Sequence, residues 1–161
     1  MATALACLFA VSSCSSDSKP PSQAQSIPSY ANNTGDAGAE QFVGYWVDQL
    51  NQATVTGKTA KFKSLGFSTC TQCTNFTQTL QEIYGAGGHV ETAGWKITAI
   101  VPETGLPKGE TGISVKLKVA PQTVYKTKGA SPEKHPGGDL RIRLLLTRPA
   151  GVWRVTTFDI G

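Results

Sequence analysis

Residues 113–119 read Ile-Ser-Val-Lys-Leu-Lys-Val, so apolar and polar side chains alternate without a break. Successive side chains of a β-strand point to opposite faces, and this alternation therefore predicts a strand with one face in a core and one in water. A similar period occurs at 95–99, and further strands are predicted at 140–147 and 152–158, on either side of the turn Arg148-Pro149-Ala150-Gly151. That turn is short enough for an antiparallel hairpin. We expect four antiparallel strands in the C-terminal half.

The N-terminal half carries a different period. Between Ala37 and Thr56 the apolar side chains fall on one helical stripe, and Gly57 follows as a helix stop. A short second helix is expected from Thr59 to Gly66, and a third from Thr71 to Tyr84. Helices followed by antiparallel strands predict an α+β fold, with three N-terminal helices packed on a curved four-stranded antiparallel sheet.

Composition fits one folded domain with a basic C-terminal half. The 161 residues are 39% hydrophobic and 16% charged, with a net charge of +4. From His89 onward there are 11 Lys and Arg against 6 Asp and Glu, but no dense basic run that would indicate nucleic-acid binding. No stretch after the leader approaches the roughly 20 apolar residues that span a bilayer.

The N-terminus has the pattern of a lipoprotein signal. An apolar run from Ala2 to Val11 is followed by Ser12, Ser13 and Cys14. Export signals need an apolar stretch and small residues at the cut, and in the lipoprotein version the next thiol receives a diacylglyceryl group. We prefer Cys14 to Cys7 as the lipidated residue, because the apolar run before Cys7 is too short. A signal normally begins with Lys or Arg, and none precedes Cys14, so we expect the true start to lie upstream of Met1. The alternative is an ordinary N-terminal helix with a buried cysteine.

Residues 15–36 are rich in Ser, Pro, Ala and Asn, a composition that cannot bury enough apolar area to fold. We therefore divide the chain into a signal peptide with its lipobox at 1–14, a disordered tether at 15–36 and a single domain at 37–161. This organisation predicts an exported protein held by its lipid at the outer face of the cytoplasmic membrane.

Several motifs occur in a distinctive order. They are the helix segment 39–51 (Ala-Glu-Gln-Phe-Val-Gly-Tyr-Trp-Val-Asp-Gln-Leu-Asn), Cys70-Thr71-Gln72-Cys73, Tyr84-Gly85-Ala86-Gly87-Gly88 and Gly94-Trp95. Together they resemble an actinobacterial lipoprotein family of unknown function. Three helices on a four-stranded sheet, with a closing strand that begins Gly-Val-Trp-Arg-Val at 151–155, also resemble the nuclear transport factor 2-like, or SnoaL-like, cone, which is a cystatin-like shape. The resemblance supports the location and the fold but implies no substrate.

The pair Cys70 and Cys73 can bridge, bind a metal or exchange disulfides. A zinc ion would need two further ligands, and His89 and His135 are isolated in the sequence. A redox motif should follow a buried strand, whereas this pair follows a short helix. We expect a structural disulfide in an oxidising compartment, and no metal or cofactor.

Two groups of residues are candidates for binding. A cone leaves room between its long helix and its sheet, and the residues that could line a pocket there are Tyr45, Trp46, Trp95 and Phe158; the alternative is that these aromatics are core. Lys126, Lys128 and Lys134 lie in a long loop between the middle strands and are candidates for contact with an anionic surface, against the alternative of an inert mobile hairpin.

No catalytic residue is assigned from the sequence, because Asp48, the acid well inside the first helix, is expected to face solvent. The leading hypothesis is a non-catalytic envelope lipoprotein that binds a small apolar ligand or a protein partner. One alternative is a SnoaL-like enzyme in which a pocket acid acts on a bulky carbonyl or polycyclic substrate; another is a purely structural or regulatory surface module. A dimer through the sheet stays open.

Overall fold

The structure is a computed structural model that describes residues 27–161. Its helices are α1 (Gly35–Thr56), α2 (Ala60–Lys63) and α3 (Thr71–Gly85), with the short 3-10 helices η1 (Ser29–Asn32) and η2 (Pro149–Gly151). Its strands are β1 (Gly87–Thr92), β2 (Trp95–Pro102), β3 (Glu110–Val119), β4 (Gln122–Thr127), β5 (Glu133–His135), β6 (Gly138–Thr147) and β7 (Arg154–Ile160). The α+β class and the helices-then-strands order are confirmed.

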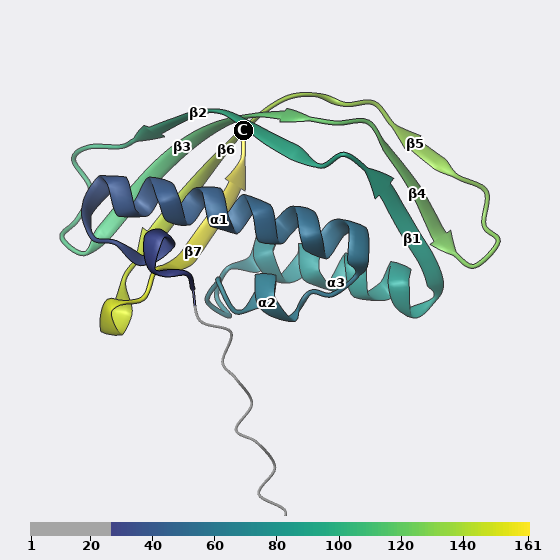
Figure 1. Cartoon of the computed structure of the whole chain (residues 1–161), viewed down its shortest axis with the longest axis horizontal. Coiled ribbons are helices and arrows are strands. Elements are labelled where there is room, and N and C mark those ends of the chain that lie inside the picture. Colours follow the sequence, from purple (N-terminus) through teal and green to yellow (C-terminus); the bar gives the residue numbers. More distant parts are fainter. Residues whose placement is uncertain (1–26) are drawn as a thin grey trace, which may run out of the picture.

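The strands form two antiparallel sheets that continue one another. The four-stranded sheet has the order β2-β3-β6-β7, and the three-stranded sheet has the order β1-β4-β5. Only two residues separate β1 from β2, β3 from β4 and β5 from β6, so the strands of one sheet lead directly into those of the other. In Figure 1 this bent surface arches over α1, with the helices on its concave side. The expected four-stranded sheet is therefore extended by the three-stranded sheet β1-β4-β5, which we call the arm.

The bend between the sheets occurs where the strands have close backbone contacts. The amide of Ala120, between β3 and β4, donates to the carbonyl of Gly94, between β1 and β2, over 3.0 Å. At Gly137, between β5 and β6, a β-carbon would collide with the Val119 carbonyl. The short links between the two sheets thus lie side by side, and glycine occupies the positions in them where a side chain would push the strands apart.

Asn51 of α1 fixes this bend to the long helix. Its side-chain amide donates to the Trp95 carbonyl over 2.9 Å and accepts from the Trp95 amide over 2.8 Å. Gly94 has φ +85°, and a β-carbon there would lie 2.6 Å from the Asn51 oxygen. Only glycine combines this backbone conformation with such a close approach.

The core lies between α1 and the concave face of the four-stranded sheet. Phe42, Trp46 and Leu50 recur along α1 and are fully buried. They pack with Phe62 of α2 and with alternate side chains of the strands, such as Leu144. Helical spacing on α1 and alternation on the strands thus bury the two apolar faces that the sequence predicts.

The folded part begins before residue 37, the expected domain start. The Trp153 indole donates to the Asn33 carbonyl over 2.7 Å, and Arg148 donates to the Asn32 carbonyl over 2.7 Å. Ala31 is fully buried. Polar composition predicts a tether for this segment, but the β6–β7 turn supplies partners for its backbone that local composition cannot reveal.

Two strand predictions need correction. The segment expected as a long loop after residue 119 contains β4 and β5, whose strand character is masked by the surrounding Pro and Gly residues. In β2, a bulge between Ile97 and Ala99 shifts the register, so Ala99 pairs with Lys116 and Ile100 pairs with the buried Val115. A strict two-residue period cannot continue through a bulge.

We predict that Asn51→Ala lowers the free energy of unfolding by about 1–3 kcal/mol, because a half-buried backbone donor and acceptor both lose their partner. Chemical denaturation with urea measures this change. Gln52→Ala, at the exposed neighbouring position, is the matched control and should have little effect. Equal stability of the two variants would show that the Asn51 contact does not hold the bend.

Candidate functional site

The interior beneath the sheet is occupied by side chains from the protein itself. The Trp46 ring lies 5.1 Å from the rings of both Phe62 and Phe158, centroid to centroid. Tyr45 is also buried, whereas Trp95 is half-buried near the bend. The four aromatics expected around a pocket are therefore divided between the core and its margin. Four hollows of the described chain, of about 150 to 730 Å³, are lined by other residues.

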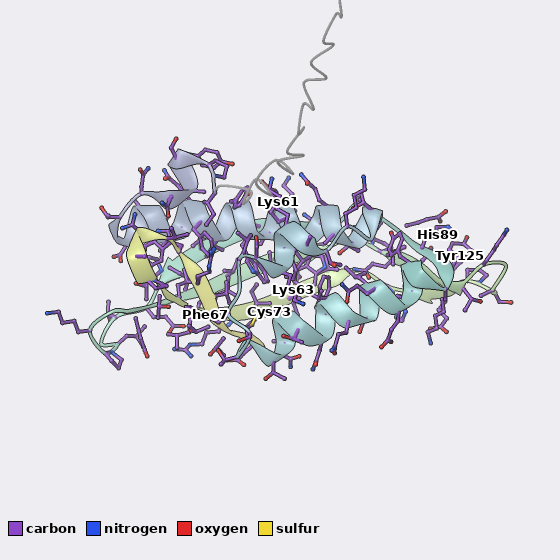
Figure 2. The ribbon with its side chains drawn as sticks, turned by 90° about the horizontal axis from the view of Figure 1, so that it is seen from below. Lys61, Lys63, Phe67, Cys73, His89 and Tyr125 are labelled. Carbon is purple, nitrogen blue, oxygen red and sulfur yellow. A yellow bond between two sulfur atoms is a disulfide. The ribbon has the colours of Figure 1, made fainter. Side chains whose placement is uncertain are left out.

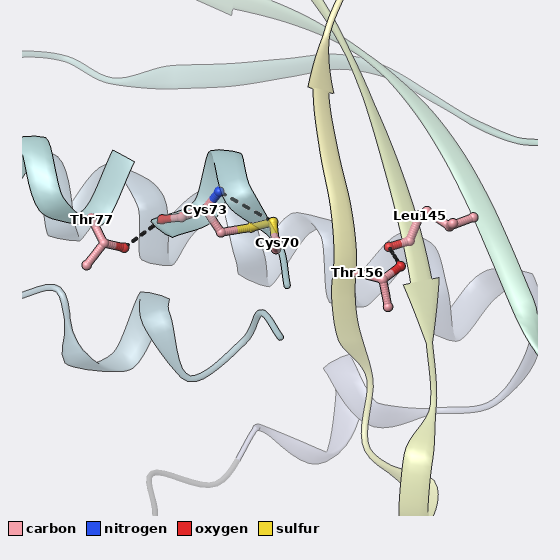
Figure 3. The surroundings of a disulfide bond; sticks show 5 residues. All are labelled: Cys70, Cys73, Thr77, Leu145 and Thr156. Carbon is pink, nitrogen blue, oxygen red and sulfur yellow. Dashed lines mark hydrogen bonds between the residues drawn. A yellow bond between two sulfur atoms is a disulfide. The ribbon is translucent and has the colours of Figure 1, made fainter. Parts of the chain in front are cut away.

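Cys70 and Cys73 are joined by a disulfide at the start of α3. Figure 3 shows the Cys70 sulfur accepting from the Cys73 amide, over 3.4 Å, while Thr77 donates to the Cys73 carbonyl over 2.8 Å. The residues are 1% and 6% exposed, and the hollow that reaches Cys73 measures about 150 Å³. Figure 2 shows Cys73 near Lys63 and Phe67, which also line this hollow. Such limited access is typical of a structural disulfide rather than an exchanging one.

The three lysines of the expected binding loop do not form one cluster. Lys126 of β4 pairs with Glu133 over 2.8 Å. Lys134 lies opposite Thr123, three positions from Lys126, so strand alternation places the two lysines on opposite faces of the arm. Lys128 follows β4, where its amide donates to the Ala86 carbonyl.

The same arm carries a stacked pair, His89 on Tyr125, whose ring centroids are 4.3 Å apart. Glu91 lies 3.7 Å from His89 on the same strand. Figure 2 shows the pair at one end of the molecule, away from Phe67 and Cys73. His135 lies on β5, opposite Gln122. Between residues 27 and 161, no three His, Cys, Asp or Glu side chains gather as metal ligands.

The outer face of the four-stranded sheet, which is turned away from the helices, carries two adjoining hollows of about 320 and 400 Å³. We call them together the outer-face groove. Lys116, Arg141 and Gly161 line both hollows. The first is completed by Val101, Ser114, Val115, Ile142, Arg143, Asp159 and Ile160, and the second by Thr98, Leu117, Asp139 and Leu140.

Apolar side chains are unusually accessible in the first hollow. Val101 is 53% exposed and Ile160 is 58% exposed, and they are two of the four large hydrophobic residues that stand exposed in the described chain. Val101 faces outward because the bulge in β2 reverses the alternation. Sequence reasoning missed this site for that reason, since the groove depends on a bulge and on strand pairing.

The carboxylate of Glu103 holds Arg143 and Ser114, two residues that line the first hollow. Glu103 follows β2 and accepts from Arg143 through two nitrogens, with a shortest contact of 2.7 Å, and from the Ser114 hydroxyl over 2.8 Å. Gly112 leaves room for it, because a β-carbon there would lie 2.5 Å from the carboxylate. The hydrogen bonds from Arg143 hold the pKa of Glu103 below its ordinary value, although desolvation opposes them. The pKa of Arg143 is raised by the same contact.

We predict that this ion pair makes stability depend on pH. Because the folded-state pKa of Glu103 is depressed, its contribution is present above the ordinary value of 4.5 and is lost as the pH falls through the folded-state value. Glu103→Gln should therefore lower the melting temperature at pH 7, with the difference from the wild type narrowing toward pH 3. Glu82→Gln, an exposed change on α3, should show no such convergence. A constant difference across pH would contradict the role of the pair.

The lipidation candidate Cys14 lies outside the described residues. Among the residues described, no helix has the length and apolar character of a membrane span.

Solved structures place the domain in a known fold. It is similar to the intermembrane space region of the chloroplast protein ARC6, with a TM-score of 0.57 at 9% identity, over 80% of this chain and 97% of that one. It is also similar to the beta subunit of the benzoate 1,2-dioxygenase from Burkholderia mallei, with a TM-score of 0.53 at 5% identity, over 80% and 90% of the chains.

A protein with a cystatin-like fold from Caulobacter vibrioides matches 74% of this chain and 87% of its own length, with a TM-score of 0.45 at 17% identity. The helices on the concave side of the curved antiparallel sheet form the nuclear transport factor 2-like, cystatin-like cone expected from the sequence. At these identities the similarity describes the fold alone.

No curated protein is significantly similar to the sequence. A family model does match, and it covers residues 24–159, which include every helix and nearly every strand described above. The chain belongs to this family of unknown function, DUF6318.

Proposed function

We propose that the protein is a lipid-anchored binding module of an actinobacterial cell envelope, which acts by holding a protein partner rather than by catalysing a reaction. The observation that carries this proposal is the contrast between the filled interior and the outer-face groove. Trp46, Phe62 and Phe158 occupy the space where a cone would hold a ligand, while Val101 stands exposed on the opposite face.

The buried polar groups also favour binding over catalysis. Among the described residues, the buried polar side chains outside the aromatic core are Gln49, Thr54, Thr59 and Thr77. None of these is an acid or base with a pKa suited to moving a proton near neutral pH. The resolved pKa shifts fall on Glu103 and Arg143, which neutralise each other at the surface. A SnoaL-like reaction would need a pocket acid, and Asp48 is exposed on α1.

The anchoring part of the proposal is supported by the sequence of the leader. Val11-Ser12-Ser13-Cys14 supplies small residues and a thiol after an apolar run. The Cys70–Cys73 disulfide suits an oxidising compartment, as an exported protein would meet. Nine residues lie between Cys14 and the start of the family match at residue 24. We therefore place the domain close to the outer face of the cytoplasmic membrane.

One observation favours a second candidate, a carrier of a small, largely apolar molecule. The Tyr45 hydroxyl and the Trp46 indole nitrogen are buried and have no hydrogen-bond partner among the described residues. A ligand that opened the interior could satisfy both groups. The two functions differ in a measurable way, because a carrier isolated from its host should retain a bound molecule.

We predict the mass of the protein recovered from the membranes of its own host. Under denaturing conditions the chain should begin at Cys14 and carry a diacylglyceryl group, because the lipobox directs lipidation and cleavage there. Native mass spectrometry should give the same mass, without an additional small molecule.

Cys14→Ala is the control, and it should remove the lipid and the membrane attachment while leaving the fold intact. An unlipidated wild-type chain would refute the anchor. A reproducible mass lost on denaturation would refute the filled interior and favour the carrier.

A further inference from the structure

We propose that the outer-face groove binds an extended protein segment in which an apolar side chain lies between carboxylates. This inference rests on the proposed binding function and specifies its partner. It begins from the charges on β3 and β6, whose outer-face side chains lie directly opposite one another in the register. Directly opposed pairs interact most strongly in a sheet, and like charges in that position are unfavourable.

Three consecutive outward pairs show the pattern. Lys118 lies opposite Asp139 and forms an ion pair with it over 3.3 Å. Two residues along, Lys116 lies opposite Arg141, so two cations face each other. Two residues further, Arg143 is opposite Ser114 and is neutralised by Glu103. The flanking pairs are compensated, whereas the central pair has no carboxylate within ion-pair distance among the described residues.

This uncompensated pair occupies the centre of the groove. Lys116 and Arg141 are shared by the two hollows, so an anion bound between them would touch both halves. A bound carboxylate would convert an unfavourable contact between cations into two charge-assisted hydrogen bonds. The opposed cations cost stability in the free protein, and a bound carboxylate would remove that cost.

The apolar half of the groove sets the second requirement. Val101 is exposed in the hollow of about 320 Å³, beside the Lys116 and Arg141 pair, and Ile160 borders the same hollow. This volume is at the lower limit of pockets that hold drug-sized molecules, and it suits a side chain inserted from a longer segment. The two hollows adjoin, so an extended strand can place a carboxylate and an apolar side chain in them from positions two residues apart, which share one face of the strand.

Two other occupants fit the charges less well. A uniformly anionic membrane would also meet Asp139 and Asp159, which line the same groove and would repel it. A flat surface also cannot fill a hollow. A second copy of this chain, paired by a twofold axis through the groove, would bring each Lys116 and Arg141 near their own copies. A segment with separated carboxylates avoids both conflicts.

The test uses the full-length chain and a synthetic peptide, acetyl-Ser-Asp-Ser-Leu-Ser-Glu-Ser-amide, whose two acids and leucine share one face when it is extended, titrated while backbone amide resonances are recorded. The expected perturbations centre on Lys116, Arg141 and Gly161. Replacing the acids of the peptide with Asn and Gln should weaken binding roughly tenfold or more, because charge-assisted hydrogen bonds are lost. The affinity should also fall with added salt.

The protein variants are Lys116→Glu and Arg141→Glu, with Lys63→Glu on α2 as a control that changes the net charge equally. The first two should each weaken binding roughly tenfold or more, while the control stays within about twofold. Lys116→Glu should also raise the melting temperature, because it replaces two opposed cations with an ion pair. A merely structural lysine would not combine higher stability with lost binding.

Charge reversal provides a complementary experiment. Lys116→Glu should gain affinity for the peptide in which Lys replaces each acid. Equal binding of the acidic and neutral peptides, or equal loss in Lys63→Glu, would overturn the proposal. If the protein binds phosphatidylglycerol vesicles and Lys116→Glu weakens that binding as much as peptide binding, the partner is a membrane. If the protein forms a dimer that Lys116→Glu dissociates, the partner is a second copy of the chain. None of these failures would alter the lipid or the absence of a ligand from the filled interior, which mass measurement tests independently.

Discussion

The contact between the Asn51 amide and the Trp95 backbone sets the geometry of the whole domain. It joins the middle of the long helix to the point where the first strand pair bends. Gly94 permits the contact. The hydrogen bond from the Ala120 amide to the Gly94 carbonyl then joins this bend to the one between β3 and β4. Because the bend is held from the concave side, the opposite face of the four-stranded sheet is left uncovered by helices (Figure 1). The groove is therefore a consequence of how the cone is closed.

Much of this architecture could be predicted from local patterns. The alternation at 113–119 became β3, and the stripe from Phe42 to Leu50 became the buried face of α1. The failures have physical causes. The β4 and β5 strands are short and flanked by Pro and Gly, so their edges read as turns. The segment at 29–36 is ordered by Trp153 and Arg148, which are more than 100 residues away in sequence.

The candidate site was less predictable than the fold. Sequence patterns identify Trp46 and Phe158 as inward-facing, but only the ring contacts show that they fill the interior rather than line it. Lys116 and Arg141 are ordinary polar positions of two strands until the register places them opposite each other. The exposure of Val101 depends on a bulge. Each of these features comes from pairing between distant segments, so no local window contains it.

The central claim is that the domain binds its protein partner through the outer face of the four-stranded sheet. Site-specific photocrosslinking in the native host tests it most directly, with the crosslinking residue at Val101 in one strain and at Val55 in another. These two valines are both exposed, at 53% and 44%, but Val55 lies on α1. We predict a discrete protein adduct from Val101 that Arg141→Glu abolishes, and none from Val55. Adducts from Val55 alone, or from neither position, would contradict the claim.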